Sequence, residues 1–212
     1  MRRSSAVLAA IAVLCVSSMA YAKTMTPGEG VKGSWFIGPI GAVSQPLGDL
    51  SDKDKGNFGT GFDVGGLVDY MLTDQIGLGV DGAFNSSSNK DVSAFKAKTT
   101  NFGAHGEWFI PTGGKVMPYL GAGVGFYNRK LEFSSGGSNI NVTNGSVGVN
   151  GGVGLGIPLA PNIGIGVDAR YHWTPSTDFD NNFSEKVNWS YATFNAAILY
   201  RVPMGGGISG MK

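Results

Sequence analysis

The sequence predicts an all-β protein, an eight-stranded antiparallel up-and-down transmembrane β-barrel, on three observations. Eight segments alternate apolar and polar residues with the period of two that a strand imposes. Their connections alternate between long polar stretches and short turns. Many of the 35 glycines share one strand face with ionisable residues, while bulky apolar residues occupy the other face. A soluble barrel would turn its apolar face inward, so this inversion favours a barrel with lipid outside and a narrow wet lumen inside.

The segment 163–173, IGIGVDARYHW, shows this inversion most clearly. Its apolar face carries Ile163, Ile165, Val167, Ala169, Tyr171 and Trp173. Its other face carries Gly164, Gly166, Asp168, Arg170 and His172. A strand in water would normally show a mixed polar surface and not a glycine run that ends in ionisable side chains. We therefore expect the apolar face to meet lipid.

The first four strands are expected at about 34–43, 60–71, 76–84 and 99–110. Pro39 interrupts the first of them, which should be the least regular because proline donates no ladder hydrogen bond. The outward positions are expected to be Trp35, Ile37, Val43, Phe62, Val64, Val68, Tyr70, Ile76, Leu78, Val80, Phe84, Phe102, Ala104, Trp108 and Ile110.

The last four strands are expected at about 117–133, 140–157, 163–173 and 188–202. GAGVGF at 121–126 imitates a dinucleotide-binding fingerprint, but no helix follows it to hold a phosphate, so strand glycine explains it better. Besides those of 163–173, the outward positions are expected to be Leu120, Ala122, Val124, Phe126, Val147, Val149, Val153, Leu155, Ile157, Ala192, Phe194, Ala196, Ile198, Tyr200 and Val202.

The connections support the same architecture. Long polar loops are expected at 44–57, at 85–98, at the SSGGSN tip and at 174–186, whereas 73–75, 111–115 and 158–162 read as short turns. An even strand number with all long loops at one end is typical of bacterial outer-membrane barrels. With the N-terminus in the periplasm, the long loops would be extracellular.

The two ends of the chain read as processing and tail segments. Residues 1–22 are expected to be a cleavable signal peptide, with Arg2 and Arg3, an apolar run at 6–16 and Ala20-Tyr21-Ala22 before the cut. An uncleaved anchor is the alternative, but the run is short against the roughly 20 residues of a spanning helix. Residues 23–33 would be a periplasmic lead-in, 34–202 the barrel and 203–212 a glycine-rich tail.

Composition excludes several function classes. The only cysteine, Cys15, lies in the signal peptide, so the mature chain has no disulfide and no thiolate metal site. Lys and Arg (16) nearly balance Asp and Glu (15), which leaves no basic stripe for nucleic acid.

The units GFDVGGLVDYMLTDQIGLGVDGAF and MPYLGAGVGFY resemble the small eight-stranded outer-membrane barrels of the OmpA, OmpX and opacity-protein type, often described as porin-family proteins. The resemblance covers about 34–202 and implies a monomer without cofactor in the outer membrane of a Gram-negative bacterium. It also implies contact with outer-membrane lipid and lipopolysaccharide and with the assembly machinery. The chain departs from the family pattern at its end, where PMGGGISGMK follows the last strand in place of a terminal aromatic residue.

Two sets of outward aromatic residues are expected to form girdles at the two membrane interfaces. The set near the short turns is Trp35, Tyr70, Trp108 and Tyr200, and the set near the long loops is Phe62, Phe84, Phe102, Phe126, Tyr171 and Trp173.

Ionisable residues on the inward face are expected to form a lumen charge network: Asp63, Asp69, Asp81, His105, Glu107, Arg129, Asp168, Arg170, His172 and Arg201. Interior charges must be paired or hydrated, so the network could simply plug and stiffen the barrel. The alternative is a thin, gated ion path. Eight strands enclose little more than their own side chains, which disfavours a wide solute channel.

Catalytic and metal-binding interpretations have weaker support. His105 with Glu107, and Asp168 with Arg170 and His172, share a face, but spacing alone supplies no third metal ligand. A lipid A-modifying hydrolase would need a serine, a histidine and a carboxylate near the outer leaflet. His172, Thr174 and Asp178 come nearest, with threonine where serine is wanted. We therefore predict no catalytic, cofactor or metal residue.

The sequence thus favours an outer-membrane barrel with a structural or surface-interaction role and at most weak pore activity. A small ion or solute channel is the first alternative, and a lipid A-modifying hydrolase is the second. The hydrophilic loops are candidate binding sites for a host or cell-surface ligand.

Overall fold

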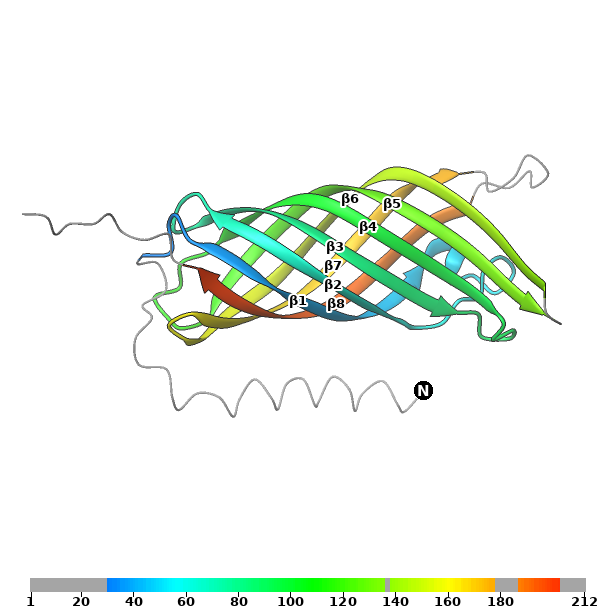
Figure 1. The fold of residues 1–212 in the computed structure, drawn as a ribbon, viewed down its shortest axis with the longest axis horizontal. Helices are drawn as coiled ribbons and strands as arrows, with labels where there is room; N and C mark the ends of the chain where they lie inside the picture. Colours follow the sequence, from blue (N-terminus) through cyan, green and yellow to red (C-terminus); the bar gives the residue numbers. More distant parts are fainter. Residues whose placement is uncertain (1–29, 136–137, 178–186, 203–212) are drawn as a thin grey trace, which may run out of the picture.

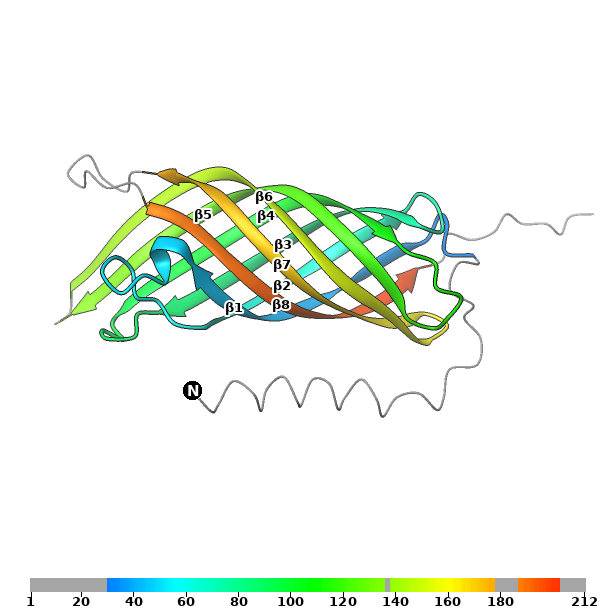
Figure 2. The same ribbon diagram turned by 180° about the vertical axis from the view of Figure 1, so that it is seen from behind.

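The computed structural model describes residues 30–135, 138–177 and 187–202. They form one closed barrel in which each strand pairs with the next and β8 returns to β1 (Figures 1 and 2). The elements are β1 (Trp35–Leu47), the short 3-10 helix η1 (Gly48–Leu50), β2 (Gly61–Met71), β3 (Ile76–Ser88), β4 (Phe95–Phe109), β5 (Met117–Ser135), β6 (Ser138–Ala160), β7 (Ile163–Thr177) and β8 (Val187–Val202). All eight strand pairs are antiparallel, so the predicted fold class is confirmed.

The signal peptide expected at 1–22, most of the lead-in expected at 23–33 and the tail expected at 203–212 lie outside the described residues. Within the described part of the chain, no helix has both the length and the apolar character needed to cross a membrane.

All four of the predicted long loops are partly strand. β1 continues to Leu47 and β7 to Thr177, inside the stretches 44–57 and 174–186 that we expected to be loops. β3 continues to Ser88 and β4 begins at Phe95, inside the stretch 85–98 that we expected to be a loop. β5 and β6 likewise extend to Ser135 and from Ser138, so the first two and the last two residues of SSGGSN belong to paired strands. The prediction was wrong because it required an apolar face. Backbone pairing continues beyond the apolar band, as at the outward pair Ser86↔Lys98, where an outward side chain no longer has to be apolar.

The irregularity expected of β1 at Pro39 occurs where β1 pairs with β8, the pair that closes the barrel and that we call the seam. β1 pairs with β2 without interruption from Trp35↔Tyr70 to Ser44↔Gly61. Against β8 it pairs from Trp35 to Ile37 and again from Ile40, and the ladder skips Gly38 and Pro39. Proline has no N–H to donate, so the closing seam loses ladder bonds at this point.

The exterior is apolar, and the middle of the interior is polar. Phe102, Ile198 and Val153 are 65%, 61% and 57% exposed, whereas Asp63 and Asp81 on inward positions are only 4% and 8% exposed. Leaving a large apolar side chain in water forgoes about 1.5–3 kcal/mol of burial energy, and the strands expose many such side chains. This surface is suited to lipid.

A packed cluster fills the barrel at the end that bears the longer connections. Its buried members, which we call the outer cap, are Leu50, Phe58, Ala97, Tyr127, Trp189 and Tyr191, with Phe95 and Leu131 packed against them. Leu50 and Phe58 come from the segment between β1 and β2, where the Phe58 N–H donates to the Leu50 carbonyl at 2.8 Å. A connection between strands therefore folds back and contributes to the core.

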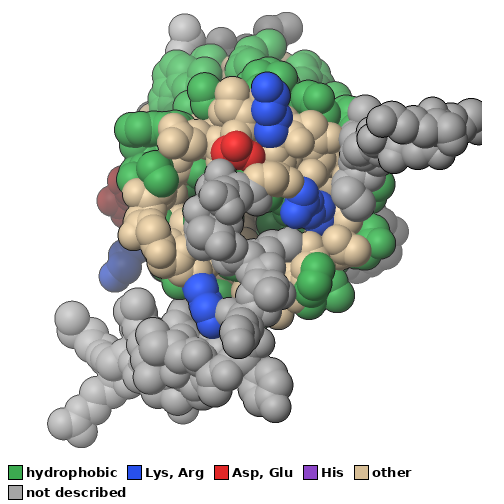
Figure 3. Space-filling view, turned by 90° about the vertical axis from the view of Figure 1, so that its left-hand side faces the viewer, with side chains coloured by type: hydrophobic (Ala, Val, Ile, Leu, Met, Phe, Trp, Pro, Cys, Tyr) green, Lys and Arg blue, Asp and Glu red, His purple; other side chains and the backbone are tan. Residues whose placement is uncertain are grey.

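The opposite end carries the short turns and the start of β1 (Figure 1). Figure 3 looks onto this end, where hydrophobic side chains rim the barrel and a few charged side chains lie nearer its centre.

Candidate functional site: the barrel interior

Glycines on inward positions make room for the larger interior side chains. A Cβ added at Gly79 would lie 1.8 Å from Asp69 Oδ1, and one at Gly154 would lie 2.3 Å from the Tyr119 ring atom Cζ. Both distances are far below van der Waals contact. Glycine is therefore a packing requirement at these two positions, because a neighbouring strand's side chain lies over each of them.

One charged cluster is centred on His105. Asp69, Gly79 and His105 are cross-strand neighbours on β2, β3 and β4, so the first and third side chains meet above the glycine. His105 Nε2 lies 2.8 Å from Asp69 Oδ1, and His105 Nδ1 lies 2.8 Å from Asp81 Oδ1. Both ring nitrogens can donate only when the ring is doubly protonated. The geometry therefore fits an imidazolium held between two carboxylates, with the His105 side chain only 2% exposed.

A second charged cluster is centred on Arg170. Glu107, Gly121, Gly152 and Arg170 follow one another across β4, β5, β6 and β7, so the two charged side chains face each other over two glycines. Arg170 Nη2 lies 3.6 Å from Glu107 Oε1, and Arg170 Nε lies 3.7 Å from Asp168 Oδ1. This cluster, like the first, places two carboxylates around one cation.

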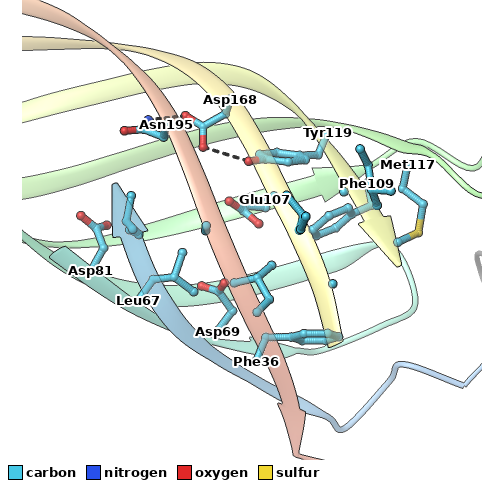
Figure 4. Close-up of a pocket in the computed structure, with 18 of the residues that line it drawn as sticks. Phe36, Leu67, Asp69, Asp81, Glu107, Phe109, Met117, Tyr119, Asp168 and Asn195 are labelled. Atoms are coloured by element: carbon cyan, nitrogen blue, oxygen red, sulfur yellow. Dashed lines mark hydrogen bonds between the residues drawn. The ribbon is translucent and has the colours of Figure 1, made fainter. Parts of the chain in front are cut away.

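Asp168 is further fixed by neutral donors. Tyr119, Gly154, Asp168 and Asn195 form another cross-strand row, and Figure 4 shows the two side-chain hydrogen bonds along it. The Tyr119 hydroxyl donates to Asp168 Oδ2 at 3.0 Å, and Asn195 Nδ2 donates to Asp168 Oδ1 at 2.6 Å. Both carboxylate oxygens of Asp168 thus have a partner.

The second histidine has neutral hydrogen-bond partners. His172 Nδ1 lies 3.1 Å from the Tyr127 hydroxyl, and His172 Nε2 lies 3.3 Å from Thr193 Oγ1. Its ring stacks on Tyr191 with centroids 4.5 Å apart and planes at 4°. His172 thus joins the outer cap to the charged middle of the barrel.

Arg129 lies at the level of the outer cap. Its guanidinium donates to Thr174 Oγ1 at 3.1 Å, to the Pro175 carbonyl at 3.2 Å and to Asn144 Oδ1 at 3.0 Å. It also lies over the Trp189 ring, 5.9 Å from the centroid. Tyr127, Arg129 and Trp189 are between 0% and 2% exposed, so side chains fill the interior at this level.

Below the cap lies a cavity of about 130 Å³ that reaches the short-turn end of the barrel. Apolar side chains such as Phe36, Phe109 and Met117 line the part near the turns, and Asp81 and Glu107 line the deeper part (Figure 4). Asp63 also lines the cavity, and its Oδ1 has no hydrogen-bond partner within the described part of the chain.

The predicted lumen residues all lie on inward positions, but they gather in separate groups. Asp69, Asp81 and His105 form one group, and Glu107, Asp168 and Arg170 form another. Arg129 and His172 contact the outer cap, and Asp63 lines the cavity. Arg201 lies at the short-turn end, where its Nε donates to Ser34 Oγ at 2.9 Å and its Nη2 to the Gly30 carbonyl.

The weak catalytic and metal candidates are not assembled into sites. Among the residues described, no group of three His, Cys, Asp or Glu is arranged to hold a metal ion. The Thr174 hydroxyl donates to the Trp189 carbonyl at 2.7 Å and accepts from Arg129, so it is not bonded to His172. Asp178 lies outside the described residues.

The residues expected in the two aromatic girdles lie on the outward side. Trp35 and Tyr70 pack with ring centroids 4.8 Å apart near the short turns. At the other level Phe102 faces Phe126 across β4 and β5. The outward residues of the two sets are Trp35, Tyr70, Trp108, Tyr200, Phe62, Phe84, Phe102, Phe126, Tyr171 and Trp173. From Ile163 to Trp173, at about 3.4 Å per residue and a tilt of about 40°, β7 rises about 26 Å, close to the height of an outer-membrane apolar band.

The outer cap was not foreseen from the sequence. Tyr127 fell on the predicted inward face, but nothing marked it as a packing residue. Leu50 and Phe58 lie alone in polar stretches where no periodicity could reveal them. The only available signal was the presence of large apolar residues in otherwise hydrophilic loops, a weak one because exposed apolar residues are common.

A closed eight-stranded barrel with an apolar exterior and an ionisable interior is the architecture of a bacterial outer-membrane protein. Residues 6–190 match the family described as the outer membrane protein beta-barrel domain, and the chain belongs to this family. Among curated proteins, none matches the sequence of this chain.

Solved structures show the same fold. Neisserial surface protein A is 19% identical, with a TM-score of 0.58 over 82% of this chain and 100% of its own. The outer membrane protein OprG from Pseudomonas aeruginosa is 15% identical, with a TM-score of 0.57 over 81% of this chain and 96% of its own. The outer membrane protein AlkL is 13% identical, with a TM-score of 0.51 over 89% of this chain and 98% of its own. At these identities the similarity concerns the fold.

Proposed function

We propose that this chain is an integral protein of the bacterial outer membrane with a structural or surface-interaction role and at most weak pore activity. The observation that carries the proposal is the filled interior at the outer cap. Tyr127, Arg129 and Trp189 have almost no exposed surface there, and Trp189 Nε1 donates to Thr99 Oγ1 at 3.0 Å across the barrel. The proposed route to the membrane is export by a signal peptide at 1–22 that is then removed.

The charged lumen supports a plug more than a pore. Each charged cluster joins side chains of different strands, β2, β3 and β4 at His105 and β4 and β7 at Arg170, and so ties the barrel wall together. An ion would have to displace the outer cap to pass. One observation favours a pore: the cavity that reaches the short-turn end is lined by acidic residues in its deeper part. A small, gated channel is therefore the second candidate function.

Conductance in planar bilayers tests the proposal. We expect the wild-type chain to show no openings above the lipid baseline, and Trp189→Ala to produce them by removing the largest side chain of the outer cap. Trp173→Ala is the matched control, because Trp173 is 42% exposed on the lipid-facing side of β7 and contributes nothing to the cap. Steady openings in the wild type and in both variants would refute the plug and favour the channel.

Integration into the membrane has its own test. A folded barrel should migrate differently on a gel before and after boiling, and the migrations should be identical for a chain that has not folded. We expect folding in liposomes to give the shifted band. Absence of the shift, with a helical circular-dichroism spectrum, would refute the membrane proposal.

A surface role is supported by the ordered segment between β1 and β2. Lys55 pairs with Asp49 at 2.9 Å, Asp49 Oδ2 accepts the Asn188 N–H at 2.8 Å, and Asn89 Nδ2 donates to the Gly56 carbonyl at 2.6 Å. These bonds join the β1–β2 connection to the β3–β4 connection and to the start of β8 as one hydrophilic surface. A preformed surface binds a partner at lower entropic cost. A host or cell-surface ligand is proposed for it.

The remaining proposals concern partners and chemistry. A monomer in contact with outer-membrane lipid, lipopolysaccharide and the assembly machinery is the proposed state, and no nucleic acid is expected. We expect no catalysis on lipid A, since the Thr174 hydroxyl is engaged away from His172. Mass spectrometry of lipid A incubated with the protein should show unchanged acyl chains, and shortened chains would establish a hydrolase.

A further inference from the structure

The outward positions of the strands are uncharged with one local exception. Within the strands that the structure describes, the charged residues that point outward are Lys96, Lys98, Lys130 and Glu132. All lie on the adjoining strands β4 and β5, near the end that bears the longer connections. We call these residues the lysine patch. Every other outward position of these strands is neutral, so the patch is a local feature of the lipid-facing surface.

The lysine patch places like charges opposite each other. Lys98 and Lys130 are direct cross-strand partners, and like charges in this position destabilise a sheet. Both ammonium groups turn to Glu132, with Lys98 Nζ 2.5 Å from Oε2 and Lys130 Nζ 2.7 Å from Oε1. Lys96, the cross-strand partner of Glu132, is exposed. Three lysines around one carboxylate leave an excess of positive charge.

The level of the lysine patch is set by the aromatic residues on the same strands. Phe102 and Phe126 are outward cross-strand partners, 65% and 54% exposed. Outward aromatic residues lie at the headgroup level of a membrane. Lys98 precedes Phe102 by four residues on β4, toward the end that bears the longer connections. At about 3.4 Å per residue and a tilt of about 40° this places Lys98 about 10 Å farther out. The neutral polar pair Thr100 and Asn128 occupies the step between.

We infer that the lysine patch binds the phosphate groups of a phosphorylated glycolipid in the outer leaflet. This inference rests on the proposed outer-membrane location. Lysine binds phosphate as a compact charge. A phosphate oxygen held between Lys98 and Lys130 would reduce the repulsion between the two ammonium groups. Glu132 occupies the same two ammonium groups in the free protein, so it acts as an internal competitor for the anion.

Retention of single lipids by the folded full-length mature chain, measured by native mass spectrometry, tests the inference. The probes are diphosphoryl lipid A, chemically dephosphorylated lipid A and phosphatidylglycerol. We expect the wild type to retain diphosphoryl lipid A over both others. With each lysine contributing about fivefold near an anionic surface, Lys98→Gln/Lys130→Gln should lower retention about 25-fold.

Two further variants separate the site from general charge. Lys53→Gln/Lys90→Gln removes the same charge from exposed positions in the connections, and we expect it to retain lipid A as the wild type does. Glu132→Gln should raise the retention of diphosphoryl lipid A, because it frees both ammonium groups. A purely structural role of the lysine patch would not produce this gain.

The inference is overturned if Lys98→Gln/Lys130→Gln retains lipid A as well as the wild type, or if phosphatidylglycerol is retained equally. Its failure differs from failure of the proposed location. A wild-type chain that gives no heat-dependent gel shift in liposomes refutes the membrane location and the lysine site with it. A chain that folds there but shows no preference for phosphate refutes the lysine site alone.

Discussion

His105→Leu should be among the most destabilising single substitutions in the barrel wall. The imidazole contacts Asp69 and Asp81 at 2.8 Å on its two sides, and the three side chains are 2%, 10% and 9% exposed. Two hydrogen bonds to charged groups contribute about 1.5–3 kcal/mol each. Removing the cation from a buried cluster costs about 3–5 kcal/mol. The hydrogen-bond sum and the buried-charge cost therefore agree on a fall of about 3–5 kcal/mol in the free energy of unfolding.

The free energy of unfolding, measured by denaturant titration in liposomes, gives this cost directly. The folded fraction is read from the heat-dependent gel shift, and an unchanged m-value shows that the same surface unfolds. The triple variant Asp69→Asn/His105→Gln/Asp81→Asn keeps the volumes but removes all three charges. It should regain most of the loss, because no uncompensated charge then remains in the interior.

His172→Leu is the internal comparison. That ring contacts the hydroxyls of Tyr127 and Thr193, so its loss leaves no buried charge behind. We expect a cost of about 1–3 kcal/mol for the broken neutral hydrogen bonds, smaller than for His105→Leu. The reasoning is refuted if His105→Leu lowers the free energy of unfolding by less than about 1 kcal/mol, or by less than His172→Leu does. Either result would mean that water in the lumen hydrates the carboxylates of Asp69 and Asp81.

Three further substitutions or titrations test other parts of the barrel. Val153→Arg, on the lipid-facing side of β6, should cost about 2–4 kcal/mol, with Val153→Leu as the neutral control; no loss would mean that the facing assignment is wrong. Gly154→Ala would place a Cβ 2.3 Å from Tyr119 Cζ and should cost about 1–3 kcal/mol through overpacking, so an unfolding free energy equal to that of the wild type would contradict the described interior. The backbone N–H of Asn188 holds the pKa of Asp49 below its usual 3.8. That contact should therefore persist from neutral pH down to 3.8 and be lost only below it. An amide resonance of Asn188 that titrates at a higher pH would contradict this.

The two-faced strands could be predicted from the sequence because lipid imposes a strict rule. Along 163–173 every outward side chain is apolar or aromatic, and the structure places β7 at Ile163–Thr177 with that facing. Beyond the lipid-facing band, outward side chains no longer have to be apolar. The ladder continues at the outward pair Ser86↔Lys98 with no apolar signal, and the strand ends were therefore underestimated.

The interior could be predicted as a composition but not as a set of contacts. Whether His105 meets Asp69 or another carboxylate depends on the register of three strands. That register makes Gly79 the residue between them. The outer cap was missed for a different reason. Phe58 is 1% exposed although its neighbours in the sequence are polar, because its burial depends on the fold-back of a connection.

The closed sheet also has a consequence for the order in which the barrel can form. β1 and β8 complete the circle, and Ser34 and Arg201 at this seam are hydrogen-bonded although they are 167 residues apart. Neighbouring hairpins such as β2–β3 close short loops, whereas the seam must wait for the last strand and carries the largest loop-closure entropy. Until then both edge strands remain open templates for pairing with another chain. With the ladder already interrupted at Pro39, sealing this edge is the step at which assembly is most exposed to aggregation.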